Sequence, residues 1–328
     1  MDNLTHTLSG VILSRAGLNR VTPEAGWLLV MAANVPDIEF VTRLWGATVY
    51  LDLHRGPTHA LAFAPLVALL PLPAWRWLAR RARPSARTWA AAYLCSLAGV
   101  ISHLLFDWLN AYGVRLALPF RDTWFRLDWL YVVDLWVWAI LGAGVAAGVL
   151  AKLVYGEIGA RQGPGRAGAW LVLGLLAAYL GVRAEAHARA VAVLDARLYQ
   201  GETPRRTLAL PGPFNPFRWR GLVRTDSAWR SVEVDLLGEF NPEAARVYHD
   251  PAKSALLAAA REAPAMQSFL RFAQAAAWQV APAPQPEGAW EVTATDLRFG
   301  EPAQGLFTAR ALLDQQGRVL EHEFRMTR

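Results

Sequence analysis

Four apolar stretches of this sequence are long enough to cross a lipid bilayer, and they constrain the fold more than any other feature. A helix needs about 20 mostly apolar residues to span the hydrocarbon core. The stretches are residues 59–78, 89–109, 129–153 and 167–182, the last extended by Arg183. Only 18% of the residues are charged, against roughly 25% in soluble domains, so the composition also indicates a chain that meets lipid.

Two shorter apolar segments precede these stretches, at residues 4–18 and 25–35. At about 1.5 Å per residue they are too short to cross comfortably. We therefore predict a re-entrant or interfacial hairpin. Pro65, Pro71 and Pro73 interrupt the first long stretch, which is still expected to be a span.

Basic residues between the spans predict the orientation, because cytoplasmic loops are enriched in Lys and Arg. The loop between the first and second spans has five arginines and no acid: Arg76, Arg80, Arg81, Arg83 and Arg87. Between the third and fourth spans, Lys152, Arg161 and Arg166 outweigh Glu157. The loop 110–128 and everything after the fourth span are then expected outside. The basic residues behind the net charge of +6 therefore set the orientation of the spans in the membrane. We expect no nucleic-acid partner.

The composition changes near residue 200, where prolines and charges return. Alternating apolar and polar residues at 232–236, 290–294 and 319–324 predict strands. The segment 252–278 is predicted to be helical. The predicted fold class is mainly α: a polytopic α-helical membrane domain (1–199) followed by an extramembrane α+β module (200–328). A helix over 183–199 would tether the module, and the turn-rich segment 211–219 would lie against the membrane domain.

Histidines and acids within the apolar half are the candidate chemistry of this chain. Ionisable groups in membrane segments are costly, so they are expected to be paired, metal-bound or functional. The single cysteine, Cys95, excludes an internal disulfide and a Cys-rich zinc module. A metal would therefore need imidazole and carboxylate ligands, and seven residues are candidates: His6, Asp37, His54, His59, His103, Asp107 and Asp134.

Spacing supports several of these candidates. His103 and Asp107 are four residues apart, so on a helix they share one face and could grip one cation; alternatively they hydrogen-bond to each other. His59 falls in the first turn after Pro57, with His54 on the loop before it. These two could instead be a capping and an interfacial histidine.

The other three candidates could also have roles other than metal binding. Asp37 follows Pro36, where the preceding helix must end, so its carboxylate could turn into a cavity or cap the next element. His6 could be a surface residue. Asp134, one turn into the third span, could be a ligand or a partner of a histidine N–H.

The predicted topology favours a metal site. It places all seven candidate residues at one depth in the membrane, on the outer side. Imidazole and oxygen ligands without thiolate suit Zn²⁺ first, with Mn²⁺ or Fe²⁺ as alternatives. The number of candidates would allow one or two ions.

Four motifs, MDNLTHTLSG, AANVPDIEF, HRGPTHALAF and SHLLFDWLNAYG, resemble the membrane-bound metal-dependent hydrolase family of YdjM-, YbcI- and YfhP-like bacterial inner-membrane proteins. The resemblance covers the first half of the chain, and PFNPFRW with its appended module is more like the YfhP branch. It implies an inner-membrane location. The ligands it implies are His6, Asp37, His59, His103 and Asp107.

The chain is also distantly similar to zinc-dependent phospholipase C and P1 nuclease, which hydrolyse phosphoesters with a metal cluster. The later His-x-x-x-Glu pair of that group has no match here. By this resemblance Asp134 or His54 would substitute, or fewer metals would bind.

These features predict a membrane-embedded hydrolase acting on a phosphoester, or a similar bond, in a lipid or lipid-linked substrate. Asp37 or Asp107 would bridge metals or act as base, and Arg55 would hold a phosphate oxygen. One alternative is a non-catalytic metal- or lipid-binding scaffold that recruits a partner through its C-terminal module. Another is a transporter, which about four spans without opposed repeats disfavour.

Overall fold

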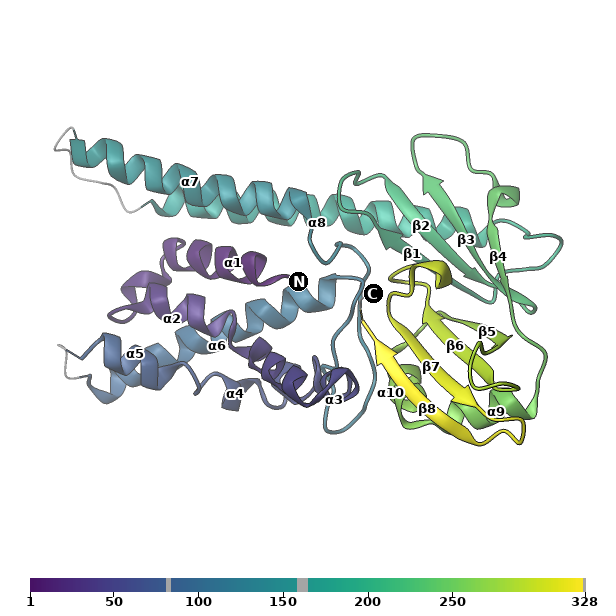
Figure 1. The fold of residues 1–328 in the computed structure, drawn as a ribbon. Helices are drawn as coiled ribbons and strands as arrows, with labels where there is room; N and C mark the ends of the chain where they lie inside the picture. The colour runs from purple at the N-terminus through teal and green to yellow at the C-terminus, as the bar shows by residue number, and fades with distance from the viewer. Residues whose placement is uncertain (81–83, 158–164, 327–328) are drawn as a thin grey trace. The chain divides into compact units, whose positions relative to one another are not determined.

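The computed structural model describes residues 1–80, 84–157 and 165–326 (Figure 1). Arg81, Arg83 and Arg161, which the topology prediction uses, lie outside these residues. The chain divides into two compact units. Unit 1 consists of Met1–Glu39, Arg55–Ala186 and Pro211–Pro216, and unit 2 of Phe40–His54, His187–Leu210 and Phe217–Arg328.

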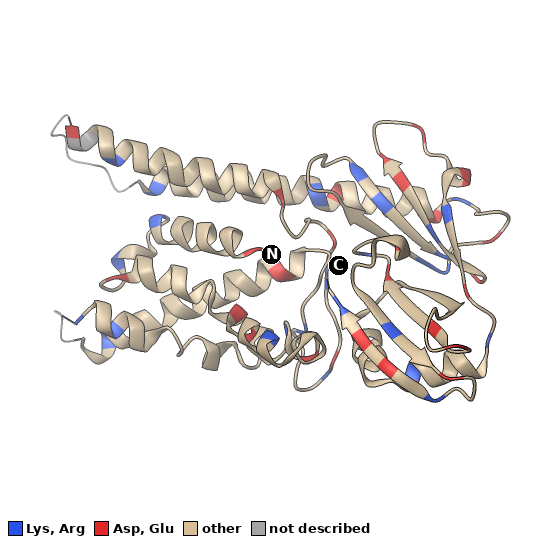
Figure 2. Cartoon of the chain, viewed as in Figure 1, with Lys and Arg blue, Asp and Glu red and all other residues tan. Residues whose placement is uncertain are grey.

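Unit 1 is helical. Its helices are α1 (Asn3–Arg15), α2 (Ala25–Ala32), α4 (Ala64–Val67), α5 (Leu72–Leu78), α6 (Ala86–Leu109), α7 (Leu135–Glu157) and the first part of α8 (Arg166–Asp195). Short 3₁₀ helices connect them: η1 (Leu18–Arg20), η2 (Val35–Trp45), whose second part belongs to unit 2, and η3 (Pro57–His59). Figure 2 shows long runs of α7 without charged side chains, as expected for a helix in lipid.

Three of the described helices are long and apolar enough to cross a membrane, namely α6, the segment Leu135–Val154 of α7, and α8. The stretch 59–78, predicted to be a span, does not form one continuous helix, and only as a bent pair could it count as a fourth span. The chain there forms η3, α4 and α5, and the paired segments Ala47–His59 and Ala64–Leu78 are bent by 88°. The three prolines named above explain the breaks, because proline lacks the N–H of the helical ladder and its ring clashes with the preceding turn.

The predicted hairpin at the N-terminus forms two helices, α1 and α2, and glycines let them pack closely. A Cβ on Gly10 of α1 would lie 3.0 Å from the Leu29 carbonyl oxygen of α2. A Cβ on Gly99 of α6 would lie 2.7 Å from the Ala32 Cβ. Small residues at such contacts allow backbones to approach. The close approach brings the end of α2 against the middle of α6.

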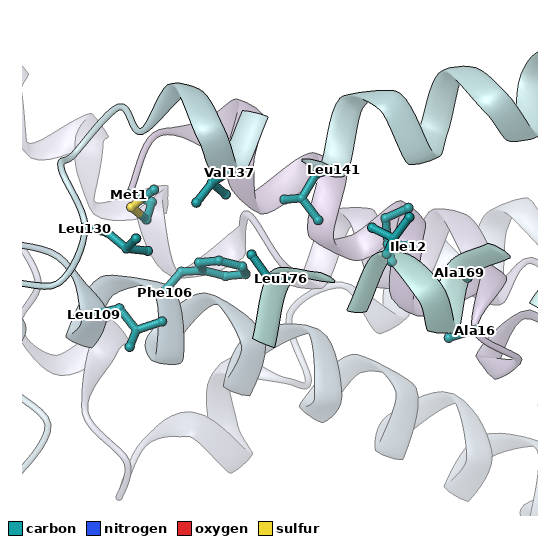
Figure 3. Close-up of a cluster of buried hydrophobic side chains, with 11 residues drawn as sticks. Met1, Ile12, Ala16, Phe106, Leu109, Leu130, Val137, Leu141, Ala169 and Leu176 are labelled. Atoms are coloured by element: carbon teal, nitrogen blue, oxygen red, sulfur yellow. The ribbon is translucent and has the colours of Figure 1, made fainter. Parts of the chain in front are cut away.

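The third and fourth predicted spans correspond to α7 and α8, with corrected ends. α7 begins at Leu135, so Asp134 precedes the helix and does not lie one turn inside it. The fourth span and the predicted tether are a single helix, α8, of 30 residues. A buried apolar cluster joins α1, α6, α7 and α8, and Figure 3 shows Ile12, Phe106, Leu141 and Leu176 among its members.

Unit 2 contains two four-stranded antiparallel sheets with strands in chain order. The first sheet is β1 (Arg206–Pro211), β2 (Arg218–Arg224), β3 (Ala228–Asp235) and β4 (Arg246–His249). The second is β5 (Ala276–Pro282), β6 (Trp290–Asp296), β7 (Thr308–Leu313) and β8 (Val319–Arg325). The three predicted strand segments fall in β3, β6 and β8 and are confirmed. With eight described strands, a mainly α class fits the chain only in part.

The helix predicted over 252–278 is two short helices followed by a strand. α9 (Ala255–Glu262) ends before Pro264, which starts α10 (Pro264–Phe272), and β5 begins at Ala276. Ala263 between the helices is extended, as expected for a residue before proline. α10 packs on β7 and β8 (Figure 1).

Two short segments belong to a different unit from the one that the predicted boundary at residue 199 assigns them to. Helix α3 (Ala47–Leu53) belongs to unit 2, where the Asp52 carboxylate accepts hydrogen bonds from Ser268 (2.9 Å) and Arg271 (2.7 Å) of α10. Conversely, Pro211–Pro216 belongs to unit 1, and the Trp136 indole N–H donates to the Phe214 carbonyl at 2.8 Å. The turn-rich segment thus lies against the helical unit, as predicted.

Candidate metal centre

Four side chains of unit 1, Asp37, His59, His103 and Asp107, form a group that could bind a metal ion. One ligand atom from each lies within 4.8 Å of all the others. The His59 Nε2 and His103 Nε2 atoms are 3.0 Å apart. The Asp107 Oδ2 lies 3.3 Å and 3.4 Å from these two nitrogens, and the Asp37 Oδ1 lies 3.5 Å and 3.6 Å from them.

The local structure of three separate segments brings the group together. His103 and Asp107 share one face of α6, as their spacing predicts, and both are fully buried. His59 ends η3, which begins at Pro57. Asp37 lies at the start of η2, directly after Pro36, where α2 has already ended. Two of the three segments are therefore positioned by prolines that end or start a helix.

A backbone carbonyl fixes the ring orientation of His103. Its Nδ1 lies 2.7 Å from the carbonyl oxygen of Ala33, at the C-terminal end of α2. A carbonyl oxygen only accepts hydrogen bonds, so Nδ1 must carry the proton. The Nε2 of the neutral ring then presents its lone pair to the group.

A carboxylate and a hydroxyl fix His59 in the same way. The Glu39 Oε2 lies 3.4 Å from the His59 Nδ1, and the Thr58 Oγ1 lies 3.0 Å from it. The Thr58 hydroxyl donates its own hydrogen to Glu39, so towards His59 it acts as an acceptor. Both partners therefore favour a proton on Nδ1, which leaves the Nε2 lone pair of the neutral ring directed at the group.

The donor set fits a divalent cation. Two lone pairs 3.0 Å apart repel each other unless a positive charge lies between them. Donors about 2.0–2.1 Å from a tetrahedral ion are about 3.3 Å from one another. The His59 and His103 Nε2 atoms lie 3.0 Å from each other and 3.3–3.6 Å from the two carboxylate oxygens. The histidine Nδ1 contacts with a carboxylate and a carbonyl are the usual supports of metal-ligating histidines. The residues present therefore fit a metal.

Asp37 is the most exposed member of the group, with 19% of its side chain accessible. Its Oδ1 faces the Nε2 atoms of His59 and His103, so a cation bound at the group would contact this carboxylate directly. The positive charge of such a cation would keep Asp37 ionised at neutral pH.

His6 lies beside the group but is not one of its four members. Its ring stacks on His103 with 3.7 Å between centroids, and its Nε2 is 3.6 Å from the Asp107 Oδ1. Among the described residues, neither of its ring nitrogens has a hydrogen-bond partner. The edge of Phe106, from the apolar cluster of Figure 3, packs on the ring.

Arg55 brings a buried guanidinium to the same carboxylate. Its Nη2 is 2.9 Å from the Asp107 Oδ1, and its Nη1 donates to the Asn110 side chain at 3.2 Å and to the Gly113 carbonyl at 3.0 Å. The guanidinium also lies over the Tyr112 ring, 4.6 Å from its centroid. Asn110, which follows the last residue of α6, is a polar residue of the site that the sequence analysis did not single out.

Besides His6, two further predicted ligands lie outside the group. His54 follows α3 in unit 2, and its ring stacks on Tyr50 with 4.6 Å between centroids. Asp134 caps α7: its Oδ1 accepts from the backbone N–H groups of Trp136 (3.1 Å) and Val137 (3.2 Å), and the Tyr179 hydroxyl donates to it at 3.1 Å. A carboxylate satisfied by a helix N-terminus is a cap.

Glu39 is a second site residue that the sequence analysis missed. It stands two residues after Asp37 in the quoted motif AANVPDIEF. The available signal was an acid within an apolar segment, since charged residues there usually have a partner. Its side chain is only 5% exposed, and its partners come from Arg55–His59, which no local pattern predicts.

Comparisons with known proteins agree with a membrane protein of two parts. The family described as YdjM inner membrane protein matches residues 1–190, and the family described as YfhP C-terminal alpha/beta plait domain matches residues 255–326. The uncharacterized protein YfhP of Bacillus subtilis (strain 168) is 30% identical over 144 residues, which cover 41% of this chain and 42% of that protein. The match thus spans under half the length of this relative. No solved structure matches the chain.

Proposed function

Because the chain belongs to the YdjM inner membrane protein family, we propose that it is a membrane-embedded, metal-dependent hydrolase. Its substrate is a lipid or lipid-linked molecule with a phosphoester bond. The observation that supports this most directly is the pair of Nε2 atoms 3.0 Å apart, on two histidines whose Nδ1 atoms are held by acceptors. That arrangement suits a cation far better than two neutral rings facing each other.

The metal in this proposal is one divalent ion held by Asp37, His59, His103 and Asp107, with His6 close enough to join. Nitrogen and oxygen donors without thiolate suit Zn²⁺ first, and Mn²⁺ or Fe²⁺ as alternatives. When bound, such an ion polarises a phosphoryl oxygen and makes water nucleophilic near neutral pH. A second ion would need further ligands beyond these four.

The chain's own residues supply the rest of the chemistry. Asp37 is partly exposed, so the carboxylate oxygen that does not bind the metal can accept a proton from water and pass it to solvent. The Arg55 guanidinium, buried among Asp107, Asn110 and Tyr112, can donate paired hydrogen bonds to two phosphate oxygens. The low dielectric of a buried site strengthens both interactions.

The substrate class follows from the surroundings. The ligands come from α6, a candidate membrane span, and from the segments around the bent helix pair. A substrate with an acyl or prenyl chain would bring its phosphate to such a site while its tail stays in lipid. By the positive-inside rule the site and the C-terminal module face the outer side of the cytoplasmic membrane.

The decisive experiment compares two histidine variants of the full-length protein in detergent. His103→Ala removes a ligand, and His322→Ala removes an exposed histidine of β8 as the matched control. We expect zinc content, and hydrolysis across a panel of phospholipids and isoprenoid phosphates, to be lost in the first variant only. Full activity of His103→Ala would refute the proposed enzyme. Zinc bound by the wild type without turnover on any substrate would favour the metal-binding scaffold.

Sidedness needs a separate measurement. Single cysteines placed at exposed positions of unit 2, in a Cys95→Ser background, should react with an impermeant maleimide in intact cells stripped of their outer membrane. Labelling only after the membrane is opened would place the C-terminal module in the cytoplasm and overturn the predicted orientation.

A further inference from the structure

We infer that Glu39 is the positioning residue of this centre: it keeps the proton of His59 on Nδ1, so that Nε2 is available as a ligand, and it holds Arg55 in place. No pattern in the sequence assigned Glu39 a role. The part of the inference that concerns a metal rests on the proposed function, whereas the part that concerns the ring proton does not.

The first step of the argument is the placement of the two carboxylate oxygens. The Oε2 atom faces the His59 Nδ1 at 3.4 Å and accepts the Thr58 hydroxyl hydrogen. The Oε1 atom accepts the backbone N–H of Arg55. A single buried carboxylate thus contacts both the histidine ligand and the residue that carries the guanidinium.

The second step concerns the hydroxyl. The Thr58 hydroxyl uses its hydrogen to bond Glu39, so its oxygen can only accept a hydrogen bond from the His59 Nδ1, 3.0 Å away. Replacing Glu39 by a group that donates would reverse this chain of hydrogen bonds. The Nδ1 would then become the acceptor, and the proton would move to Nε2, where it blocks the lone pair that a metal needs.

The third step concerns the backbone of Arg55. Its φ of 51° lies in the left-handed region, which is uncommon for a residue other than glycine. Two backbone hydrogen bonds hold it there, from its own N–H to Glu39 and to its carbonyl from the Arg115 N–H at 3.1 Å. This conformation directs the guanidinium to Asp107. Glu39 therefore positions a ligand and an anion-binding group together.

The variant that separates these roles is Glu39→Gln. Its amide oxygen can still accept the Arg55 N–H, and its NH₂ group then faces Thr58 and the His59 Nδ1 as a donor. Asp128→Asn is the matched control, because Asp128 is also a buried acid of unit 1 at 6% exposure but lies in the loop between α6 and α7, paired with Arg126. Far-UV circular dichroism and gel filtration establish that each variant is folded.

The first readout needs no metal. In protein labelled with ¹⁵N-histidine, a downfield Nδ1–H signal that disappears in His59→Gln belongs to His59. We expect this signal in the wild type and in Asp128→Asn, and its loss in Glu39→Gln. Retention of the signal in Glu39→Gln would overturn the inference. Should Glu39→Gln not fold, Glu39→Asp, whose carboxylate is one methylene shorter, is expected to weaken the same signal, and an unchanged signal would again overturn it.

The second readout is zinc affinity, measured by competition with a chromophoric chelator. Loss of the group that orients a metal-ligating histidine typically weakens binding about 10–100-fold, and we expect this for Glu39→Gln but not for Asp128→Asn. Equal affinity in wild type and Glu39→Gln would overturn the inference while leaving the proposed metal centre intact. Absence of zinc binding in the wild type would instead overturn the proposed function, and the Nδ1–H signal alone would then decide the role of Glu39.

Discussion

His103 of α6 donates its Nδ1–H to the carbonyl oxygen of Ala33, 2.7 Å away, and so joins a candidate ligand to the end of α2. The contact exists because α2 and α6 approach closely at Gly99. Helix packing and ligand orientation are therefore one feature of this protein, and a change in the first should be seen in the second.

Gly99→Ala tests this coupling. The new Cβ would lie 2.7 Å from the Ala32 Cβ and 3.1 Å from the Ala33 nitrogen, so α2 must move away. Overpacking of this kind costs about 1–3 kcal/mol, and zinc affinity should fall with it. The control is Gly174→Ala in α8, where a Cβ meets nothing within 4 Å and helix propensity alone should be neutral or favourable. Thermal unfolding in detergent and zinc titration provide the measurements; equal behaviour of the two variants would argue against the coupling.

Arg55→Lys tests the anion-binding role. Lysine keeps the charge but cannot reproduce the paired contacts of the guanidinium with Asp107, Asn110 and Gly113. We expect kcat/KM on the best phosphoester substrate to fall about 10–100-fold, or about 1.4–2.7 kcal/mol, while bound zinc is retained. Arg126→Lys is the control, and an unchanged kcat/KM for Arg55→Lys would remove Arg55 from the substrate site.

Asp134→Ala separates a helix cap from a ligand. The carboxylate accepts two backbone N–H groups at the start of α7 and the Tyr179 hydroxyl of α8. Losing the cap should cost about 1 kcal/mol, and the partly buried Tyr179 hydroxyl also loses its acceptor. We expect a lower unfolding temperature with unchanged zinc content. Tyr179→Phe should show a smaller version of the same effect, and loss of zinc in Asp134→Ala would restore its predicted role as a ligand.

Asp52→Ala tests how α3 is held in unit 2. Its bonds to Ser268 and Arg271 are partly exposed, at 37% for Asp52 and 53% for Arg271, so solvent screening limits them to below about 1 kcal/mol. The expected result is local: faster hydrogen exchange in the peptide that contains α3, with little change in the unfolding temperature. Asp250→Ala, which breaks the Arg224 pair elsewhere in unit 2, should leave that peptide unchanged.

Glu202 gives unit 2 a defined response to acid. Hydrogen bonds from Thr225 and Ser227 lower the pKa of Glu202 from 4.5 to about 2. A carboxyl whose pKa is depressed in the folded state stabilises the protein above its unfolded pKa, and the contribution disappears as pH falls towards its folded pKa. The unfolding temperature of Glu202→Gln should therefore lie furthest below that of the wild type at pH 7. The difference should shrink between pH 4.5 and 2; a difference independent of pH would contradict this assignment.

Local patterns were sufficient for several features of the protein. The length of the apolar stretches predicted α6, α7 and α8, because a membrane-spanning helix is formed by consecutive residues. Alternation predicted β3, β6 and β8. The spacing of His103 and Asp107 placed them on one face, because a helix repeats every 3.6 residues.

Tertiary contacts decided the rest. Nothing local to Glu39 or Ala33 indicates that each would hold a histidine Nδ1, since their partners lie 20 and 70 residues away in the chain. Nor does the sequence distinguish Asp134, which caps a helix, from Asp107, which belongs to the candidate metal-binding group. Residue types and their periodicity determined which groups this protein could use. The packing of distant segments determined which of those groups meet, because hydrogen-bond partners are chosen by distance in space and not by distance along the chain.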